Sequence, residues 1–120
     1  MRGLLLVAHG SRRAASNEEV RDLTRRLASK ARGDFDVIDC AFLELAKPSI
    51  PDGIQCCIRQ GAEEVVVLPY FLSAGRHVAE DIPGEVKEAQ EANPGVAIRI
   101  APYLGESSGI TGLLLESACA

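Results

Sequence analysis

The sequence predicts an α/β fold: a single flavodoxin-like domain over residues 1–120, built as a three-layer sandwich around a four-stranded parallel sheet. Two observations lead to this prediction. Short apolar runs without polar alternation, beginning with Leu4 to Ala8, are typical of strands buried on both faces. Each run is followed by a segment of helical character about 10–15 residues long, and this alternation indicates βαβ units. The strand order expected for such a domain is 2-1-3-4.

The first predicted unit joins a strand at 3–8 to a helix that begins near Asn17. Ser16 and Glu19 form the S-x-x-E pattern of a capping box, in which two side chains bond backbone amides at the start of a helix. Gly33 is expected to end this helix, because glycine readily adopts the backbone conformation found just past a helix C-terminus.

Three further units follow the first. They are a strand at 37–43 with a helix at about 48–60, a strand within 63–70 with a helix from Ala79 or Pro83 to Ala92, and a strand at 96–101 with a short helix through 113–115. Gly53 is expected to weaken the second helix, because glycine has a low helix propensity.

The charge balance argues against a nucleic acid or an anionic membrane as partner. The formal net charge is -4, and the sequence has no basic tract. It also lacks a run of about 18 apolar residues that would cross a membrane. The apolar stretch after Arg2 is too short for a signal peptide and lacks a small-residue cleavage site. We therefore expect a cytoplasmic protein.

The four cysteines do not show the spacing of a metal site. Cys56 and Cys57 are adjacent, and no C-x-x-C pair occurs. Cys40 falls within a predicted strand, where a buried free thiol is expected.

Polar side chains gather in the loops that follow the predicted strands. Ligands of open parallel sheets bind outside the carboxyl ends of the strands, near the point where the strand order reverses. With the order 2-1-3-4 this point lies between the first and third strands, which carry His9 and His77, the two histidines of the chain. Glu44 follows the second strand. Two imidazoles and a carboxylate are typical ligands of divalent cobalt, iron, nickel or zinc.

The residues alone also allow structural interpretations. A histidine after a strand commonly serves as a hydrogen-bonding loop residue. Glu44, Glu80 and Asp81 fit helix starts, where the helix dipole favours carboxylates. Arg12, Arg13 and Arg76 fit surface charges, although three guanidinium groups near one edge of an acidic protein favour a polycarboxylate or phosphate ligand.

Four segments carry a resemblance to a known family: LLLVAHGSR, AFLELAKPSI, VVVLPYFLSAGRHVAEDIP and IRIAPYLG, which span Leu4 to Gly105 in this order. They resemble the class II chelatases, in particular the short CbiX-type sirohydrochlorin cobaltochelatases and the related ferrochelatases. The resemblance implies a chelatase-like fold and insertion of Co²⁺ or Fe²⁺ into sirohydrochlorin without ATP, in cobalamin or sirohaem biosynthesis. It also implies that His9 and His77 are catalytic and bind the metal, with Glu44 as their acidic partner.

The resemblance further implies how the substrates are held. The metal, Co²⁺, Fe²⁺ or Ni²⁺, is itself a substrate, and no permanently bound cofactor is expected. Arginines are suited to the carboxylates of sirohydrochlorin, and apolar and aromatic side chains to its flat face. The predicted substrate-binding residues are Ser11, Arg12, Arg13, Leu45, Tyr70, Phe71, Leu72, Ser73, Arg76 and Tyr103.

A homodimer is also predicted. The longer members of the resembled family carry two such domains in one chain, so a chain with one domain is expected to pair with a second copy. A four-stranded sheet leaves faces incompletely covered, and Ile54, Ile58 and Leu113 are expected to need burial against that partner.

The sequence also bears on two other functions. A non-catalytic tetrapyrrole- or metal-binding carrier of the same fold would have the same residues. A histidine phosphatase would need an R-H-G motif at the end of the first strand, but Ala8 precedes His9 here. The chain also lacks the glycine-rich motifs of nucleotide-binding proteins.

Overall fold

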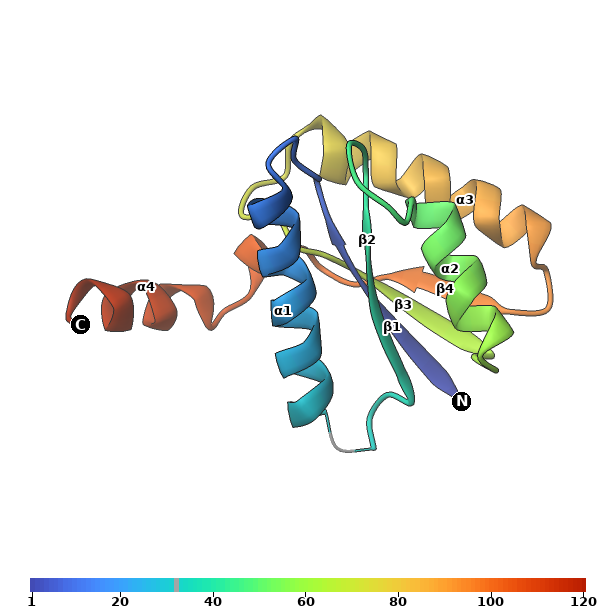
Figure 1. Ribbon diagram of the computed structural model, residues 1–120, viewed down its shortest axis with the longest axis horizontal. Coiled ribbons are helices and arrows are strands. Elements are labelled where there is room, and N and C mark those ends of the chain that lie inside the picture. The colour runs from blue at the N-terminus through green and yellow to red at the C-terminus, as the bar shows by residue number, and fades with distance from the viewer. Residues whose placement is uncertain (32) are drawn as a thin grey trace.

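Parallel strands form one sheet in the computed structural model of the chain, which describes residues 1–31 and 33–120 (Figure 1). The strands are β1 (Arg2–Ala8), β2 (Val37–Phe42), β3 (Glu64–Pro69) and β4 (Ala97–Ile100). Their order is β2-β1-β3-β4, and every pair is parallel. The predicted fold class and strand order are therefore confirmed.

Strand β1 lies in the interior of the sheet and is buried on both of its faces. Leu5 pairs with Asp39 of β2 on one side and with Val67 of β3 on the other. Because side chains alternate along a strand, Leu5 and Val7 face one layer of helices, while Leu4 and Leu6 face the other. All four are at most 5% exposed, which explains the uninterrupted apolar run in the sequence.

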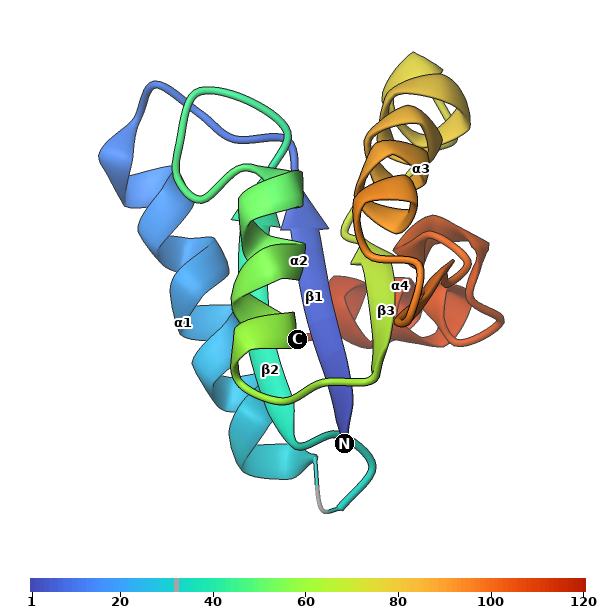
Figure 2. The ribbon, with the colours of Figure 1, turned by 90° about the vertical axis from the view of Figure 1, so that its right-hand side faces the viewer.

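Helices α2 (Ile50–Arg59) and α3 (Ile82–Ala92) cover the face that carries Leu5 and Val7 (Figure 2). Ile54 of α2 is fully buried in this core, and Ile58 packs against its margin. The expectation that these two isoleucines need a partner chain was therefore wrong, since the helix turns both toward its own sheet. Leu113 differs, because it is 55% exposed.

Helix α1 (Ala14–Lys30) lies against the opposite face and begins earlier than predicted. The predicted capping box was wrong: Ser16 lies inside the helix, and Arg13 occupies the N-cap position without a side-chain hydrogen bond. Asn17 has a different role. Its side chain accepts a hydrogen bond from the Ser11 amide at 2.9 Å and donates one to the Ser11 carbonyl at 2.8 Å, which joins the helix to the loop before it.

The ends of α1 and α2 also differ slightly from the prediction. Helix α1 ends at Lys30, before Gly33, which adopts a φ of +86° beyond the helix. Helix α2 begins at Ile50 because Ser49 caps it, accepting a hydrogen bond from the Asp52 amide.

A π-helical turn, η1 (His77–Asp81), precedes α3 directly. The sequence predicts that the third helical segment begins at Ala79 or Pro83, with His77 in a loop. In the structure η1 begins at His77, and Arg76 before it already has helical backbone angles, so the histidine belongs to the first turn of the helical segment. This turn also holds Asp81 four residues after His77.

The chain ends in the 3₁₀ turn η2 (Leu104–Glu106) and the helix α4 (Ile110–Ala118). The predicted final helix is thus confirmed and extends on both sides of Leu113–Leu115. Helix α4 points away from the rest of the molecule (Figure 1). Within the described residues, no helix combines the length and the apolar character required to span a lipid bilayer.

Gly53 permits close packing between α2 and the sheet. A Cβ atom at this position would lie 2.9 Å from the Cβ of Ala41 and 3.0 Å from Cδ1 of Leu5. The glycine therefore supports the packing of the helix, whatever its cost in helix propensity.

We expect Gly53→Ala to destabilise the fold by about 1–3 kcal/mol, because the added methyl group overpacks the core. Urea unfolding would measure the change. Gly84→Ala in α3 is the matched control, since a Cβ there has no neighbour within 4 Å, and it should raise stability by about 0.5–1 kcal/mol. Equal stability changes in the two variants would contradict the proposed packing role of Gly53.

Candidate functional site

The loops after β1 and β2 are in direct backbone contact beside His9. The Glu44 amide donates to the His9 carbonyl at 3.0 Å. Gly10 has a φ of +96°, and a Cβ atom on it would collide with the carbonyl oxygen of Glu44. Glycine is therefore needed at this position for the two loops to meet. Their contact places Nε2 of His9 3.2 Å from Oε2 of Glu44.

The two histidines lie against each other at the carboxyl edge of the sheet. The rings of His9 and His77 are 4.7 Å apart between centroids and meet edge to face, at an interplanar angle of 65°. Asp81, at the end of the same π-helical turn, holds the second ring, with Oδ2 2.7 Å from Nδ1 of His77. The structure thus brings His9, Glu44 and His77 together, as the sequence predicted from their positions after three strands.

The contacts of His9 favour a cation at Nε2. Its Nδ1 lies 2.9 Å from the Gly10 carbonyl oxygen, while Nε2 faces the Glu44 carboxylate. A neutral imidazole carries one N–H and can donate to only one of these acceptors. Both contacts are favourable together when the ring is protonated or when Nε2 and the carboxylate share a metal ion.

A groove with several carboxylates adjoins the histidine pair. It has a volume of about 480 Å³ and is lined by Leu43, Glu44, His77, Glu80, Asp81, Gly84 and Glu85. Burial, followed by the nearby Glu88 and Asp81, raises the pKa of Glu85. One oxygen of Glu85, Oε2, is buried without a hydrogen-bond partner. Negative charge around a groove attracts divalent cations.

Sequence reasoning did not identify Glu85, and it treated Asp81 as an ordinary carboxylate at a helix start. The signal that could have found them is the spacing of His77, Asp81 and Glu85, which recur every four residues. Side chains at this spacing share one side of a helix. The groove lies along that side.

Three of the other predicted residues, Phe71, Arg76 and Ser11, make defined contacts. The Phe71 ring is 6.5 Å from that of His77, and Nε of Arg76 is 3.6 Å from Oε2 of Glu80. Ser11 shapes its own loop, because its hydroxyl accepts a hydrogen bond from the Arg13 amide.

The remaining predicted substrate-binding residues differ in exposure and in their place in the fold. Exposed positions in the loops around the site are Arg12, Arg13, Leu45, Leu72 and Ser73. Tyr103 is half-buried at the start of η2. Tyr70 lines a groove along α1 together with Leu6 and Leu23, on the other face of the sheet from the core.

The described residues hold no group of three or more His, Cys, Asp or Glu side chains arranged for a metal ion. The donor set of His9, Glu44 and His77 therefore stays a prediction. Its side chains are between 39% and 52% exposed, so they are accessible from solvent.

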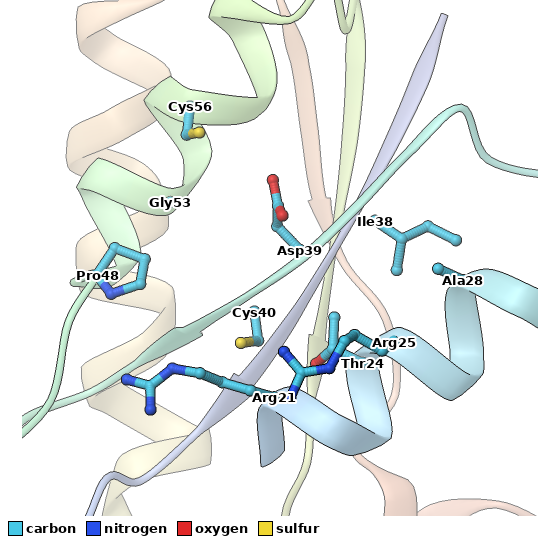
Figure 3. Close-up of a pocket in the computed structure, with 10 residues that line it drawn as sticks. All are labelled: Arg21, Thr24, Arg25, Ala28, Ile38, Asp39, Cys40, Pro48, Gly53 and Cys56. Carbon is cyan, nitrogen blue, oxygen red and sulfur yellow. The ribbon is translucent and has the colours of Figure 1, made fainter. Parts of the chain in front are cut away.

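Another cavity, of about 320 Å³, lies beside β2 between α1 and α2 (Figure 3). Its two arginines are already paired. Arg21 donates to the Lys47 carbonyl at 3.1 Å, and Arg25 forms ion pairs with Glu18 and Asp22. Arg21 also pairs with Glu18 at 3.4 Å. Carboxylates of α1 thus offset the charges of both arginines, which makes this cavity a poor site for a polycarboxylate.

The cysteines near this cavity are free thiols. Cys40 and Cys56 line it and are half-buried, so the prediction of a buried thiol at Cys40 is only partly met. Cys57 is fully buried, and this burial raises the pKa of its thiol to about 12. The thiol therefore stays protonated at neutral pH and acts as an apolar core side chain.

Comparison with known proteins identifies the family. The family model named CbiX matches residues 3–120. The chain belongs to the CbiX family. Among curated relatives of this CbiX chain, the chloroplastic sirohydrochlorin ferrochelatase of Arabidopsis thaliana is 38% identical over 103 residues, which cover 86% of this chain and 45% of the relative. The sirohydrochlorin cobaltochelatase of Sulfurisphaera tokodaii is 33% identical over 116 residues, which cover 97% of this chain and 90% of the relative.

Solved structures agree with this assignment. A CbiX protein of Marinobacter aquaeolei has a TM-score of 0.79 at 30% identity, with 99% of this chain and 94% of that chain covered. SirB of Bacillus subtilis with Fe³⁺ has a TM-score of 0.86 at 27% identity, with 96% of this chain and 45% of that chain covered. The CbiX chain thus spans about half the length of several relatives, including the sirohydrochlorin ferrochelatase of Priestia megaterium, of which it covers 43%.

We expect Glu85→Gln to raise the melting temperature by a few degrees at about pH 7.5 and to leave it nearly unchanged at about pH 4. The raised pKa of Glu85 means that the folded chain favours the protonated carboxyl group. The fold therefore loses stability as the pH rises past the ordinary carboxyl range, and glutamine removes this loss. Thermal melts across that range test the sign, with the exposed Glu91→Gln on the same helix as control. A larger gain at low pH than at neutral pH would contradict the assignment.

Proposed function

We propose that this CbiX chain inserts Co²⁺ or Fe²⁺ into sirohydrochlorin, the reaction after which its curated relatives are named, and that it does so without ATP. One observation supports the proposal most strongly. His9 and His77 lie edge to face 4.7 Å apart, beside Glu44, in a place accessible from solvent. A metal in transit needs a few nitrogen and oxygen donors with open positions, and this set provides them.

The distance between His9 and Glu44 supports a shared metal substrate. Ligand atoms at about 2.0–2.2 Å from one ion lie roughly 3 Å from each other, and Nε2 of His9 is 3.2 Å from Oε2 of Glu44. The acidic groove beside the pair would draw the cation from solvent. In this proposal the ion enters along the groove and is held by His9 and Glu44 before transfer.

His77 suits the removal of protons from the macrocycle. Its Nδ1 is held by Asp81 at 2.7 Å, which keeps the proton on Nδ1 and leaves Nε2 as a base. The tetrapyrrole loses two pyrrole protons as the metal enters, and a neutral imidazole is a reasonable acceptor. Arg12, Arg13 and Arg76 are proposed to bind its carboxylates, and Phe71 and Leu72 to contact its flat face.

The assembly around this site is also a proposal. We infer a homodimer, because Leu113, Leu114 and Leu115 of α4 are exposed and an apolar groove lies open along α1. The division of the chain as one domain over residues 1–120, and its place in the cytoplasm, stay predictions from the sequence.

An insertion assay with the purified chain tests the function. Sirohydrochlorin would be mixed with Co²⁺, Fe²⁺ or Ni²⁺ in turn, and the change in its visible absorption followed. The proposal expects metal-dependent product in excess of the enzyme concentration. Binding of sirohydrochlorin or metal without turnover would favour the non-catalytic carrier instead.

His9→Ala and His77→Ala should each lower the insertion rate by about 100-fold or more, because each removes a metal ligand or a base. The melting temperature should change little, since both side chains are partly exposed at the edge of the sheet. Arg59→Ala, in the last turn of α2, is the control and should keep full activity. Normal turnover in either histidine variant would show that this histidine is not needed for metal insertion.

Asp81→Asn should lower kcat by about 10–100-fold, because the outer partner of an imidazole sets its tautomer and basicity. The affinity for sirohydrochlorin should stay the same, since Asp81 acts through His77. Steady-state kinetics separate these effects, and Glu80→Gln serves as the neighbouring control. An equal loss from both substitutions would point to general loss of charge in the groove.

A further inference from the structure

The segment that joins β3 to His77 lies mostly in solvent. In this His77 loop (residues 70–76), residues 72–76 are all exposed, and Leu72 is 71% exposed. Phe71 packs against the margin of the core. Burial by itself therefore does little to fix the path of the loop, and its position depends on backbone contacts.

One of these backbone contacts comes from the far end of the chain. The Phe71 carbonyl accepts a hydrogen bond from the Gly105 amide at 3.0 Å. The Tyr70 amide still continues the pairing with β1, and the Gly75 carbonyl accepts from the Ala79 amide of the following helical segment. In the described part of the chain, the Gly105 bond is thus the one that ties the His77 loop to a segment outside the sheet and this helical segment.

Gly105 approaches the loop more closely than a residue with a side chain can. A Cβ atom on Gly105 would lie 1.9 Å from the carbonyl oxygen of Leu72 and 2.5 Å from its carbonyl carbon. Gly105 lies in the 3₁₀ turn η2 and outside the left-handed region, so its backbone conformation would admit any residue. Glycine is needed here for space, because two backbone segments meet at this point.

The turn that carries Gly105 is itself anchored to the sheet. The Ala101 amide donates to the Val67 carbonyl at 2.8 Å, which continues the pairing of β3 with β4 beyond Ile100. The Glu106 amide then donates to the Tyr103 carbonyl at 2.9 Å and closes the turn. The turn therefore provides a fixed surface for the His77 loop.

We propose that Gly105 is a positioning residue for metal insertion. By holding the peptide between Phe71 and Leu72, it fixes the loop that presents these two side chains to the macrocycle. The same loop leads to His77, whose ring lies 6.5 Å from the Phe71 ring. Gly105 acts through this loop. The inference rests on the proposed function, which supplies the substrates.

The Gly105 contact has a counterpart on the other side of β1. There Gly10 meets the Glu44 carbonyl, and a Cβ atom on Gly10 would lie 1.7 Å from its oxygen. In both places a glycine of one loop lies against a carbonyl of the neighbouring loop. The loops after β2 and β3, which carry Glu44 and lead to His77, are therefore held in the same way.

Steady-state kinetics of Gly105→Ala in the full chain test the proposal. The methyl group displaces the His77 loop, so KM for sirohydrochlorin should rise and kcat should fall, each by about tenfold or more. Gly109→Ala is the matched control, since its backbone is helical and a Cβ there meets Ser107 Oγ at an ordinary 3.7 Å. The control should change either constant by less than about twofold.

NMR spectra distinguish a displaced loop from general destabilisation. In Gly105→Ala the backbone amide signals of residues 70–77 should shift, whereas those of α2 should stay in place. Unchanged loop signals overturn the proposal. A lower melting temperature with unchanged KM and kcat overturns it too, because Gly105 would then support the fold alone.

Hydrogen exchange of the wild-type chain decides the question if Gly105→Ala does not fold. The Gly105 amide should have a protection factor at least about tenfold larger than that of the Gly75 amide, which donates no hydrogen bond within the described residues. Sirohydrochlorin should increase the protection of Gly105 further. Equal protection of the two amides, or no increase with sirohydrochlorin, overturns the proposal.

Binding of Co²⁺ alone separates this proposal from the proposed function. Gly105→Ala should weaken Co²⁺ binding by about tenfold, since a displaced His77 is lost as a ligand. A wild-type chain that binds Co²⁺ without inserting it would overturn the proposed function, and the loss of Co²⁺ affinity would still support the role of Gly105. An active wild-type chain whose Gly105→Ala variant binds and inserts Co²⁺ normally would overturn that role and leave the proposed function standing.

Discussion

The site depends on the interior position of β1 in the parallel sheet. This strand pairs in parallel with β2 on one side and with β3 on the other. The carboxyl ends of all three strands therefore lie at the same edge of the sheet. His9 follows β1, Glu44 follows β2, and His77 follows β3 after a loop. Residues that are 68 positions apart in the sequence, His9 and His77, therefore meet at 4.7 Å between ring centroids. An antiparallel arrangement would have placed one of these loops at the opposite edge.

Backbone contacts then set the details within that edge. Gly10 lets the loop after β2 pass close enough for Glu44 to face His9. The π-helical turn places Asp81 against His77. The carboxylate holds Nδ1 of the ring, and Nε2 takes no part in this contact. Each histidine thus has a defined orientation although it is partly exposed. Side chains that are held by neighbours lose less freedom when a substrate binds.

The two faces of the sheet differ in how completely helices cover them. One face is complete, with Ile54 and Ile82 fully buried under α2 and α3. The other has one helix, α1, beside an open apolar groove, while α4 carries three exposed leucines. A small α/β chain has too few helices for both faces. The proposed homodimer would cover more of this second face.

The sequence alone determined the fold class, the strand order, and the meeting of His9, Glu44 and His77. These features follow from the apolar runs and from the order of strands and helices along the sequence. Buried parallel strands are continuous apolar runs, and their carboxyl ends lie at one edge of the sheet. It could not determine contacts between elements. By helix propensity Gly53 is a weak point of its helix, yet the neighbouring Ala41 and Leu5 leave no space for a side chain. Ser16 matched a capping box, yet the loop anchored by Asn17 started the helix before it. The raised pKa of Glu85 results from burial in the folded chain. The direction of α4 is set by backbone hydrogen bonds in the turn before it. Such features depend on distances between segments remote in sequence, which local residue patterns do not encode.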